Sequence, residues 1–332
     1  MIKVGINGFG RIGRSVFRIL RDRDDLQVVA INDLYDNDQL AYLLRFDTVQ
    51  GPFHEPVEVH DDHIQVGGDR VEMTAERDPS QIPWGEFGVE LVVESTGVFR
   101  HREQVAQHLS AGAEKVVLTV PAKDEIDATI VLGVNEEDLR PEHRVVSNAS
   151  CTTNCLAPIA KVLDDEFGIE EGMITTVHAY TNGQRLADVP SKNLRRSRAA
   201  AENTIPTTTG AAKAVGQVLP RLAGRLDGMA VRVPVPDGSI VDLVARLGSE
   251  ASVEDIHAAL RAAARGPMRD VLQFSEDPLV SSDVIGNPHS SIVDSLSTSV
   301  EPGGYARVLS WYDNEWGYSN RVADLLARLT AV

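Results

Sequence analysis

The 332-residue sequence predicts an α/β protein in which a doubly wound parallel sheet is followed by an α+β domain with a mostly antiparallel sheet. Two observations carry this prediction. Over residues 1–150, short apolar strands alternate with helix-like segments, which is typical of βαβ units. Over the second half the apolar segments are longer. Several of them alternate polar and apolar residues, as strands do in an antiparallel sheet with one covered face.

The first half opens with the apolar segment IKVGIN, residues 2–7, which is rich in β-branched residues and predicts a strand. In RIGRSVFRILRDR, residues 11–23, apolar side chains recur at helical spacing, and LQVVAIND, residues 26–33, is again strand-like. The same alternation later predicts three more elements: a strand over 89–96, a helix over 102–112 and a strand over 115–121. Such units build a parallel sheet that helices cover on both faces.

The second half contains longer strand candidates, which lie over residues 173–182, 229–236, 239–248 and 305–314. A helix is expected over 252–266, where Ser252 and Asp255 have the spacing of a capping box. Residues 183–204 have no such periodicity and predict a long irregular loop. Loops of this length in a compact enzyme are usually functional or contact another subunit.

These patterns suggest where the domains begin and end. We expect a first domain over residues 1–150 and a second domain over 151–314. The segment over about 315–332 ends in an amphipathic helix, which we expect to pack back onto the first domain.

The composition is that of a soluble cytoplasmic protein. Hydrophobic residues make up 42% of the chain, enough for an ordinary core, and no run of apolar residues approaches the length of a membrane span. The N-terminal MIKVGINGFG lacks the charged and apolar regions of a signal peptide. Because the chain has two cysteines, a disulfide-stapled secreted scaffold is not expected.

The formal net charge of −17 argues against nucleic acids and anionic membranes as partners. Basic residues are also unevenly used, with 6 Lys against 26 Arg. An acidic, lysine-poor surface suits a salt-rich cytoplasm, where mutual repulsion of the acidic groups is screened. A codon bias combined with ordinary surface acidity explains the same composition, so a halophilic origin is one of two interpretations.

A glycine motif directly follows the first predicted strand. In INGFGRIG, Gly8, Gly10 and Gly13 have the G-x-G-x-x-G spacing and lead into the first helix. In a Rossmann-type unit the first glycine permits a tight turn, the second lets the backbone approach a pyrophosphate, and the third lets helix and strand pack closely. The alternative is a glycine turn in an unrelated α/β protein.

The residues around this motif fit a dinucleotide as well. The backbone N–H groups of Arg11 and Ile12 would face the phosphates at the positive end of the helix. Asp33 ends the second predicted strand, where an acid would bind the adenosine ribose hydroxyls and repel a 2′-phosphate. We therefore expect NAD rather than NADP as the cofactor.

The segment SNASCTTNCLAP, residues 147–158, holds both cysteines. The Cys-x3-Cys spacing is poor for zinc, and a disulfide would have to bridge adjacent turns of one helix, so we expect neither a metal nor a disulfide. Residues 144–150 are strand-like and 151–168 helix-like, which places Cys151 at a helix N-terminus, where the dipole lowers a thiol pKa. A nucleophile and a buried cysteine both remain open there, whereas Cys155 is expected in the core.

Several motifs together are highly specific: NGFGRIGR, SNASCTTNCLAP, TVHAYTN, LRRSRAAAENTIPTTTGAAKAV, RVPVPDGSIVDL and WYDNEWGYSNR. They resemble the phosphorylating, NAD-dependent glyceraldehyde-3-phosphate dehydrogenases of the glycolytic type, from residue 2 to about residue 329. The resemblance implies oxidation of D-glyceraldehyde 3-phosphate to 1,3-bisphosphoglycerate with NAD and inorganic phosphate, in glycolysis or gluconeogenesis. The reaction would pass through a thiohemiacetal and a thioester on Cys151.

The resemblance also assigns residues. It implies that Cys151 is the nucleophile and that His178 is its base. The substrate C3 phosphate would bind Thr181 and Arg232, and inorganic phosphate would bind Ser150, Thr152, Arg196, Thr209 and Gly210. A solvated basic loop is the alternative for Arg196 and its neighbours. For the cofactor, the matching positions near the adenine, the nicotinamide ribose and the nicotinamide amide are Arg77, Thr119 and Asn314.

Pro190 resembles NAD-dependent members in a loop that reaches a neighbouring subunit, which implies a homotetramer. Two departures stand out: Ser191 and Asn193 replace the expected His and Asp, and RVPVPDGS replaces the commoner RVPTPNVS. The rival readings are erythrose-4-phosphate dehydrogenase, an NADP-linked biosynthetic relative and a redox-sensing protein with a reactive cysteine.

Overall fold

The computed structural model describes residues 1–331 and divides them into two compact units. The first unit comprises residues 1–130 and 137–149 together with the C-terminal segment from Ser319 onward. The second unit comprises residues 131–136 and 150–318. None of the helices among residues 1–331 combines the length and the apolar character that a membrane crossing requires.

The first unit is built on a nine-stranded sheet of order β3-β4-β5-β2-β1-β6-β7-β9-β8. Pairing is parallel from β5 through β8, as predicted, while β3, β4 and β5 pair antiparallel at one edge. The strands are β1 (Ile2–Asn7), β2 (Leu26–Asn32), β3 (Val57–Val59), β4 (His63–Val66), β5 (Asp69–Thr74), β6 (Leu91–Glu94), β7 (Lys115–Leu118), β8 (Ala128–Thr129) and β9 (Val145–Ser147).

Helices connect these strands: α1 (Arg11–Arg21), α2 (Asn37–Arg45), α3 (Trp84–Phe87), α4 (Arg102–Val105) and α5 (Gln107–Ser110), with 3-10 turns at Pro79–Gln81 and Glu136–Asp138. One buried cluster on the sheet includes Ala30, Trp84, Val92, Val105 and Val116. The next residues of the same strands point to the opposite face and are also fully buried: Ile31, Val93 and Val117. Both faces are therefore covered, as a doubly wound sheet requires.

Two features of the first unit refine the prediction. The helix expected over 102–112 is two short helices that meet at Ala106. The C-terminal helix α9 (Trp316–Thr330) begins in the second unit, and its later part belongs to the first. Lys115 Nζ donates to the Leu329 carbonyl at 2.8 Å, and Arg23 forms an ion pair with Asp324 at 2.9 Å.

The second unit is built on a seven-stranded sheet of order β11-β12-β10-β13-β16-β15-β14. Pairing is antiparallel except between β10 and β12 and between β14 and β15, which confirms the mostly antiparallel sheet. The strands are β10 (Ile169–Ala179), β11 (Ile205–Thr208), β12 (Leu226–Val233), β13 (Ser239–Leu247), β14 (Leu272–Ser275), β15 (Ser291–Glu301) and β16 (Tyr305–Tyr312).

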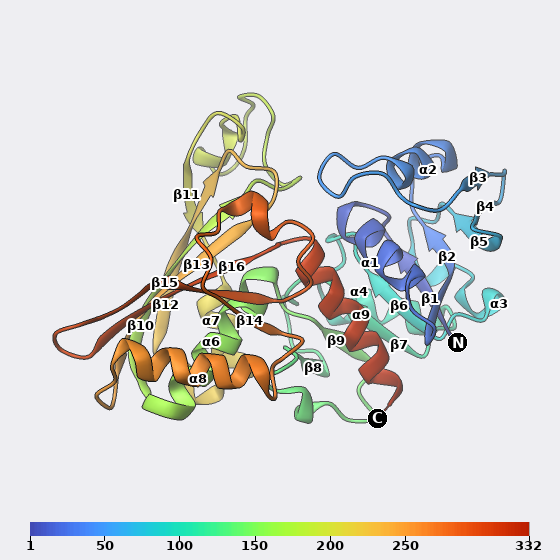
Figure 1. The fold of residues 1–332 in the computed structure, drawn as a ribbon. Helices are drawn as coiled ribbons and strands as arrows, with labels where there is room; N and C mark the ends of the chain where they lie inside the picture. Colours follow the sequence, from blue (N-terminus) through green and yellow to red (C-terminus); the bar gives the residue numbers. More distant parts are fainter. Residues whose placement is uncertain (332) are drawn as a thin grey trace. The chain divides into compact units, whose positions relative to one another are not determined.

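Three helices pack on this sheet and against each other: α6 (Cys151–Phe167), α7 (Ala211–Val218) and α8 (Val253–Arg265) (Figure 1). Ser252 and Asp255 form the predicted capping box at the start of α8. Short 3-10 turns lie at Arg195–Ser197, Pro220–Leu222 and Ser281–Val284. The first of these is the one helical turn described within the long loop 183–204, which is irregular as predicted.

Candidate active site

A cavity of about 400 Å³ lies at the carboxyl ends of β1, β2 and β6 in the first unit. The three glycines of the motif serve it in different ways. A Cβ on Gly8, whose φ is +92°, would lie 2.7 Å from the Thr96 nitrogen, and a Cβ on Gly13 would lie 2.2 Å from the Gly8 oxygen. The backbone itself therefore requires these two glycines. A Cβ on Gly10 would meet nothing within 4 Å, so this glycine faces the open space in which a ligand can approach.

The N-terminus of α1 is suited to an anion. Gly10 is its N-cap and provides no capping side chain, and the first turn, which begins with Arg11 and Ile12, contains no acidic residue. The Arg11 side chain is held by Asp47 at 2.8 Å. Asp33 accepts the Phe9 N–H at 2.7 Å, which fixes its carboxylate at the cavity. Arg77 is exposed and also lines the cavity. These groups fit the phosphates and the adenosine ribose of NAD.

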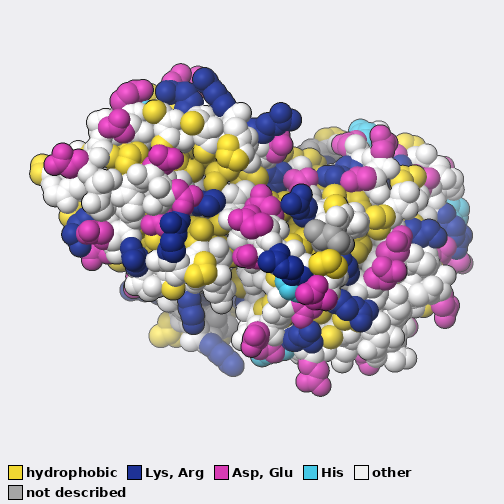
Figure 2. Space-filling model, turned by 90° about the horizontal axis from the view of Figure 1, so that it is seen from below, with side chains coloured by type: hydrophobic (Ala, Val, Ile, Leu, Met, Phe, Trp, Pro, Cys, Tyr) yellow, Lys and Arg dark blue, Asp and Glu magenta, His cyan; other side chains and the backbone are white. Residues whose placement is uncertain are grey.

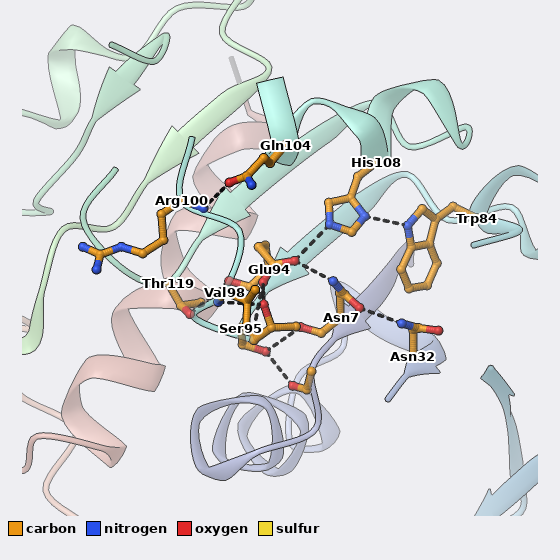
Figure 3. Close-up of polar contacts among 12 residues, drawn as sticks. Asn7, Asn32, Trp84, Glu94, Ser95, Val98, Arg100, Gln104, His108 and Thr119 are labelled. Atoms are coloured by element: carbon orange, nitrogen blue, oxygen red, sulfur yellow. Dashed lines mark hydrogen bonds and ion pairs between the residues drawn. The ribbon is translucent and has the colours of Figure 1, made fainter. Parts of the chain in front are cut away.

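A buried carboxylate organises the floor of this cavity. Glu94, at the end of β6, is fully buried and accepts a hydrogen bond from Asn7 Nδ2 at 2.6 Å (Figure 3). It also accepts the Thr96 backbone N–H at 2.9 Å and contacts the Thr96 hydroxyl. Asn7 in turn accepts from Asn32 Nδ2 at 2.8 Å. Since Asn7, Asn32 and Thr96 all line the cavity, one acidic side chain ties together three strand ends around it.

His108 also belongs to this network, in which it connects Glu94 to Trp84. The indole N–H of Trp84 donates to its Nδ1 at 3.0 Å, so Nδ1 has no proton, and Nε2 donates to Glu94 at 3.0 Å (Figure 3). Both ring nitrogens therefore have a hydrogen-bond partner. Sequence reasoning missed Glu94 and His108, because nothing in VEST or AQHLS distinguishes them locally.

The remaining predicted cofactor residues lie in different units. Thr119 is buried in the first unit, and its hydroxyl donates to the Glu94 carbonyl at 3.0 Å. Asn314 lies in the second unit after β16, where its Oδ1 accepts from Ser239 Oγ at 2.6 Å. This contact occupies the amide oxygen and so presents the Asn314 NH2 group as a donor.

The second unit brings Cys151 and His178 together. Cys151 is the first residue of α6, after the N-cap Ser150, whose Oγ accepts the Thr153 N–H at 3.1 Å. Its Sγ lies 3.5 Å from His178 Nε2. His178 is on β10, 4% exposed, and is the register partner of Arg232 on the parallel neighbour β12. Arg232 Nη1 lies 2.8 Å from His178 Nδ1 and donates to the Ala179 carbonyl at 2.9 Å.

The electrostatics of this group favour a neutral resting pair. Burial, followed by the charge of Arg232, lowers the pKa of His178 to about 3. Its Nδ1 lies 2.7 Å from the Ala179 carbonyl and 2.8 Å from Arg232 Nη1, and these two contacts suit different tautomers. The tautomer that donates from Nδ1 to Ala179 has its Nε2 lone pair toward Cys151 and is the one that can take the thiol proton. Burial raises the pKa of the Cys151 thiol, while Arg232 and hydrogen bonds from Thr152 act to lower it. The sequence predicted a lowered thiol pKa; burial, the largest influence on this pKa, raises it instead.

Tyr312 is a site residue that sequence reasoning missed. It is buried at the end of β16, and its hydroxyl lies 2.9 Å from both Thr152 Oγ1 and Thr176 Oγ1. Its ring meets the His178 ring edge-on, with centroids 5.9 Å apart. The Thr152 hydroxyl is thus engaged inside the protein, beside the Tyr312 hydroxyl.

The residues predicted to bind phosphate on this part of the sheet lie on or beside β10, β11 and β12 and at the start of α7. The guanidinium of Arg196 donates from Nε to Thr207 Oγ1 on β11 at 3.0 Å. Burial, and after it the charge of Arg196, lowers the pKa of Arg232 on β12. Thr209 and Gly210 precede α7, whose N-cap Gly210 offers no capping side chain. Thr181 follows β10, and its N–H donates to Gln184 Oε1 at 3.2 Å.

Cys155 lies one turn deeper in α6 and is fully buried, as predicted for a core residue. Burial raises the pKa of its thiol to about 12. Its Sγ contacts Ser291 Oγ and the Ser310 carbonyl, both at 3.7 Å. Both cysteines are free thiols. Among residues 1–331 no group of three or more His, Cys, Asp or Glu side chains is arranged to hold a metal ion.

Comparison with known proteins gives a consistent result. Residues 2–102 match the family model described as glyceraldehyde 3-phosphate dehydrogenase, NAD binding domain, and residues 150–314 match the model of its C-terminal domain. The chain is 57% identical over 331 residues to glyceraldehyde-3-phosphate dehydrogenase of Geobacillus stearothermophilus, covering 99% of this chain and 98% of the relative. It is 57% identical over 327 residues to glyceraldehyde-3-phosphate dehydrogenase 1 of Bacillus subtilis, covering 98% and 97%.

Proposed function

The chain belongs to the glyceraldehyde-3-phosphate dehydrogenase family, and from this premise we propose which residues carry its reaction. The protein is an NAD-dependent phosphorylating dehydrogenase that converts D-glyceraldehyde 3-phosphate and inorganic phosphate to 1,3-bisphosphoglycerate. The observation that carries the residue assignment is the 3.5 Å contact between Cys151 Sγ and His178 Nε2, beside the guanidinium of Arg232.

In the first step Cys151 Sγ attacks the aldehyde carbon while His178 Nε2 takes the thiol proton. Because burial and the charge of Arg232 disfavour the imidazolium, His178 returns this proton readily to the new alkoxide and yields a thiohemiacetal. We assign the developing oxyanion to the backbone N–H of Cys151, at the start of α6. NAD, when bound, supplies the acceptor for the hydride that leaves the same carbon.

His178 then takes the hydroxyl proton of the thiohemiacetal as hydride leaves, and the carbon becomes a thioester on Cys151. Inorganic phosphate attacks the thioester carbon, the carbon–sulfur bond breaks, and the sulfur recovers its proton from His178. We assign the substrate C3 phosphate to Thr181 and Arg232. We assign inorganic phosphate to the donors at the starts of α6 and α7 and on the loop before β11: Ser150, Thr152, Arg196, Thr209 and Gly210.

For the cofactor, we assign the pyrophosphate to Gly10 and the N-terminus of α1, and the adenosine ribose to Asp33. Arg77 would contact the adenine, Thr119 the nicotinamide ribose and Asn314 the nicotinamide amide. The Ser239 contact supports the last assignment, since it fixes the Asn314 amide in one orientation. A carboxylate at position 33 opposes a 2′-phosphate, which argues against an NADP-linked enzyme.

We further propose a cytoplasmic homotetramer in which the loop 183–204 contacts a neighbouring subunit. Two leucines support this, because Leu186 and Leu194 are 88% and 82% exposed in the isolated chain. A salt-rich cytoplasm would suit the net charge of −17. On the face in Figure 2, Asp and Glu side chains are interspersed with Arg and Lys side chains rather than gathered into one field.

The function is tested by following NADH absorbance after mixing enzyme, NAD and glyceraldehyde 3-phosphate, first without phosphate and then with it. We expect a burst of about one NADH per active site that becomes steady turnover once phosphate is added, because the acyl enzyme waits for phosphorolysis. Cys151→Ala, the matched control, should show no burst. Steady turnover without phosphate would mean that water is the acceptor, as erythrose-4-phosphate dehydrogenase activity would require.

A further inference from the structure

A buried pair of carboxyl groups lies near the proposed nucleophile, and the reaction above does not use it. Asp237 is in the turn between β12 and β13, Asp313 follows β16, and each is 1% exposed. A hydrogen bond joins their side chains. Two carboxylates can only accept hydrogen bonds, so a bond between them requires that one of the pair holds a proton.

The surrounding backbone indicates which residue holds it. Asp313 accepts three backbone N–H groups, at 2.7, 2.9 and 2.6 Å, from Gly286, Glu315 and Trp316. Three such donors stabilise an ionised carboxylate. Asp237 accepts the N–H of its own neighbour Gly238 at 2.8 Å. The proton therefore belongs to Asp237, which donates it to Asp313.

Other charged groups around Asp237 favour the same assignment. Burial, then the negative charges of Asp313 and Glu315, raise the pKa of Asp237 to about 9. Toward α6, a negative charge on Asp237 would raise the pKa of the Cys151 thiol, whereas Arg232 on β12 lowers it. Asp283, in the 3-10 turn beside Gly238, is bound by the Val280 N–H at 2.7 Å.

The turn that carries Asp237 is connected both to the backbone beside His178 and to the Asn314 amide. Gly238 has a φ of +81°, and a Cβ there would lie 2.1 Å from the Ser281 carbonyl, so the turn is closely packed. The next residue, Ser239, accepts the Ala179 N–H at 3.1 Å and donates to Asn314 at 2.6 Å. A shift of this turn would move the backbone beside His178 and the Asn314 amide together.

We propose that Asp237 is a positioning residue that works as a neutral acid: it donates its proton to Asp313, holds the β12–β13 turn, and keeps the surroundings of Cys151 free of another negative charge. This inference rests on the proposed role of Cys151. It also gives a reason for the departure from RVPTPNVS noted in the sequence, because a protonated Asp can donate a hydrogen bond as the Asn at that place could.

The test compares wild type with Asp237→Asn, which keeps a donor but cannot ionise, and with Asp237→Ala, which keeps neither. Asp227→Asn, an exposed position on β12, is the matched control. The first readout is the rate of Cys151 alkylation by iodoacetamide from pH 6 to pH 10.5. We expect Asp237→Asn to match wild type at pH 7 and to exceed it by about twofold or more at pH 10, where Asp237 ionises. Asp237→Ala should react and turn over more slowly at every pH.

The second readout is the unfolding midpoint as a function of pH, which does not depend on Cys151. Between the unfolded value of 3.8 and the folded value of about 9, the native chain keeps a proton that the unfolded chain releases. Stability from this group therefore falls as pH rises, by an amount on the order of 2 °C per pH unit. The midpoint of Asp237→Asn should rise relative to wild type across this window and level off above it, while Asp227→Asn tracks wild type.

A third readout needs no variant: the infrared spectrum of wild type should lose a protonated-carboxyl band between pH 7 and pH 10.5. The proposal is overturned if that band is missing at pH 7, or if Asp237→Asn keeps the wild-type pH profiles. It is equally overturned if Asp237→Asn loses activity at pH 7 as Asp237→Ala does. If the infrared and stability results hold while the NADH burst is absent, the proposed function fails and the proton assignment stands.

Discussion

Each unit of the molecule contains a buried histidine, and the two are held in opposite ways. His108 is fully buried with a hydrogen-bond partner on each ring nitrogen, Trp84 on one side and Glu94 on the other. His178 is nearly as buried, but its Nε2 faces the thiol of Cys151 at 3.5 Å, and its other nitrogen lies beside the cation Arg232.

This difference supports a structural role for His108 and the proposed reactive role for His178. Both ring nitrogens of His108 are used in hydrogen bonds to Trp84 and Glu94, so the ring can only hold its neighbours in place. The surroundings of His178 allow a proton to arrive from sulfur and depart again, while a nearby positive charge keeps it from staying. Burial is common to both, so the partners decide the role.

Among the variants that test this comparison, a substitution of His178 should have the largest effect. Replacing it by Asn should lower kcat by about 10²- to 10⁴-fold, because the thiol loses its general base, while the chain remains folded. Steady-state kinetics and a urea unfolding curve measure the two effects. A variant that keeps most of its kcat would show that another group takes the thiol proton.

A large loss of stability is expected at Glu94. In Glu94→Gln an NH2 group replaces one oxygen and faces donors from Asn7, His108 or Thr96, at a cost of about 2–4 kcal/mol of unfolding free energy. The apparent NAD affinity should fall with it, since these donors border the cavity, whereas kcat at saturating NAD should change little. Urea unfolding and NAD titration measure both, with the exposed Glu103→Gln as control. Equal stability of the two variants would contradict the network.

The acid side of the pH–stability curve sharpens the comparison further. His178 has a folded pKa of about 3 against 6.5 in the unfolded chain, so between these values the unfolded state binds a proton that the native state refuses. Stability is therefore lost as pH falls through this window, by about 1.4 kcal/mol per pH unit for one proton. His178→Asn should lose this slope, which unfolding curves from pH 7 to pH 4 measure. Parallel curves for wild type and variant would rule out a neutral buried His178.

The smallest effect is expected at Cys155, which like His108 is fully buried and contacts polar groups inside the protein. Cys155→Ala should cost about 1 kcal/mol of stability, as a small cavity does, and leave both kcat and the alkylation rate of Cys151 unchanged. Thermal unfolding and a thiol-labelling time course provide the check. If the fast-labelling phase is lost in this variant, the reactive thiol is Cys155 and its assignment to Cys151 is wrong.

Much of the fold could be predicted from local sequence. The start of α6 at Cys151 follows from a strand-like segment running into a helical one, and the Ser252/Asp255 pair marks the start of α8. Two short or irregular features were not predicted from local sequence. The antiparallel strands β3–β5 lie in polar segments, and the helix break at Ala106 has no Gly or Pro to signal it.

The site was less predictable because its contacts are distant in sequence. Glu94 meets Asn7 across 87 residues, and Thr152 meets Tyr312 across 160. Motif strings brought the reacting residues to notice, but they do not say which hydroxyl points inward or which carboxyl keeps a proton. Those properties depend on burial and on the orientation of backbone donors, which exist only once the strands are paired.

The pairing of β10 with β12 has a consequence for how activity is acquired. His178 and Arg232 are opposite each other only in one parallel register, and 54 residues of chain separate them. Closing so long a connection costs chain entropy before the contact can stabilise the fold, so this pair should form late in folding. Refolding chains can thus regain secondary structure before catalysis, and the delay between far-UV signal and returning activity would time the moment at which this register is found.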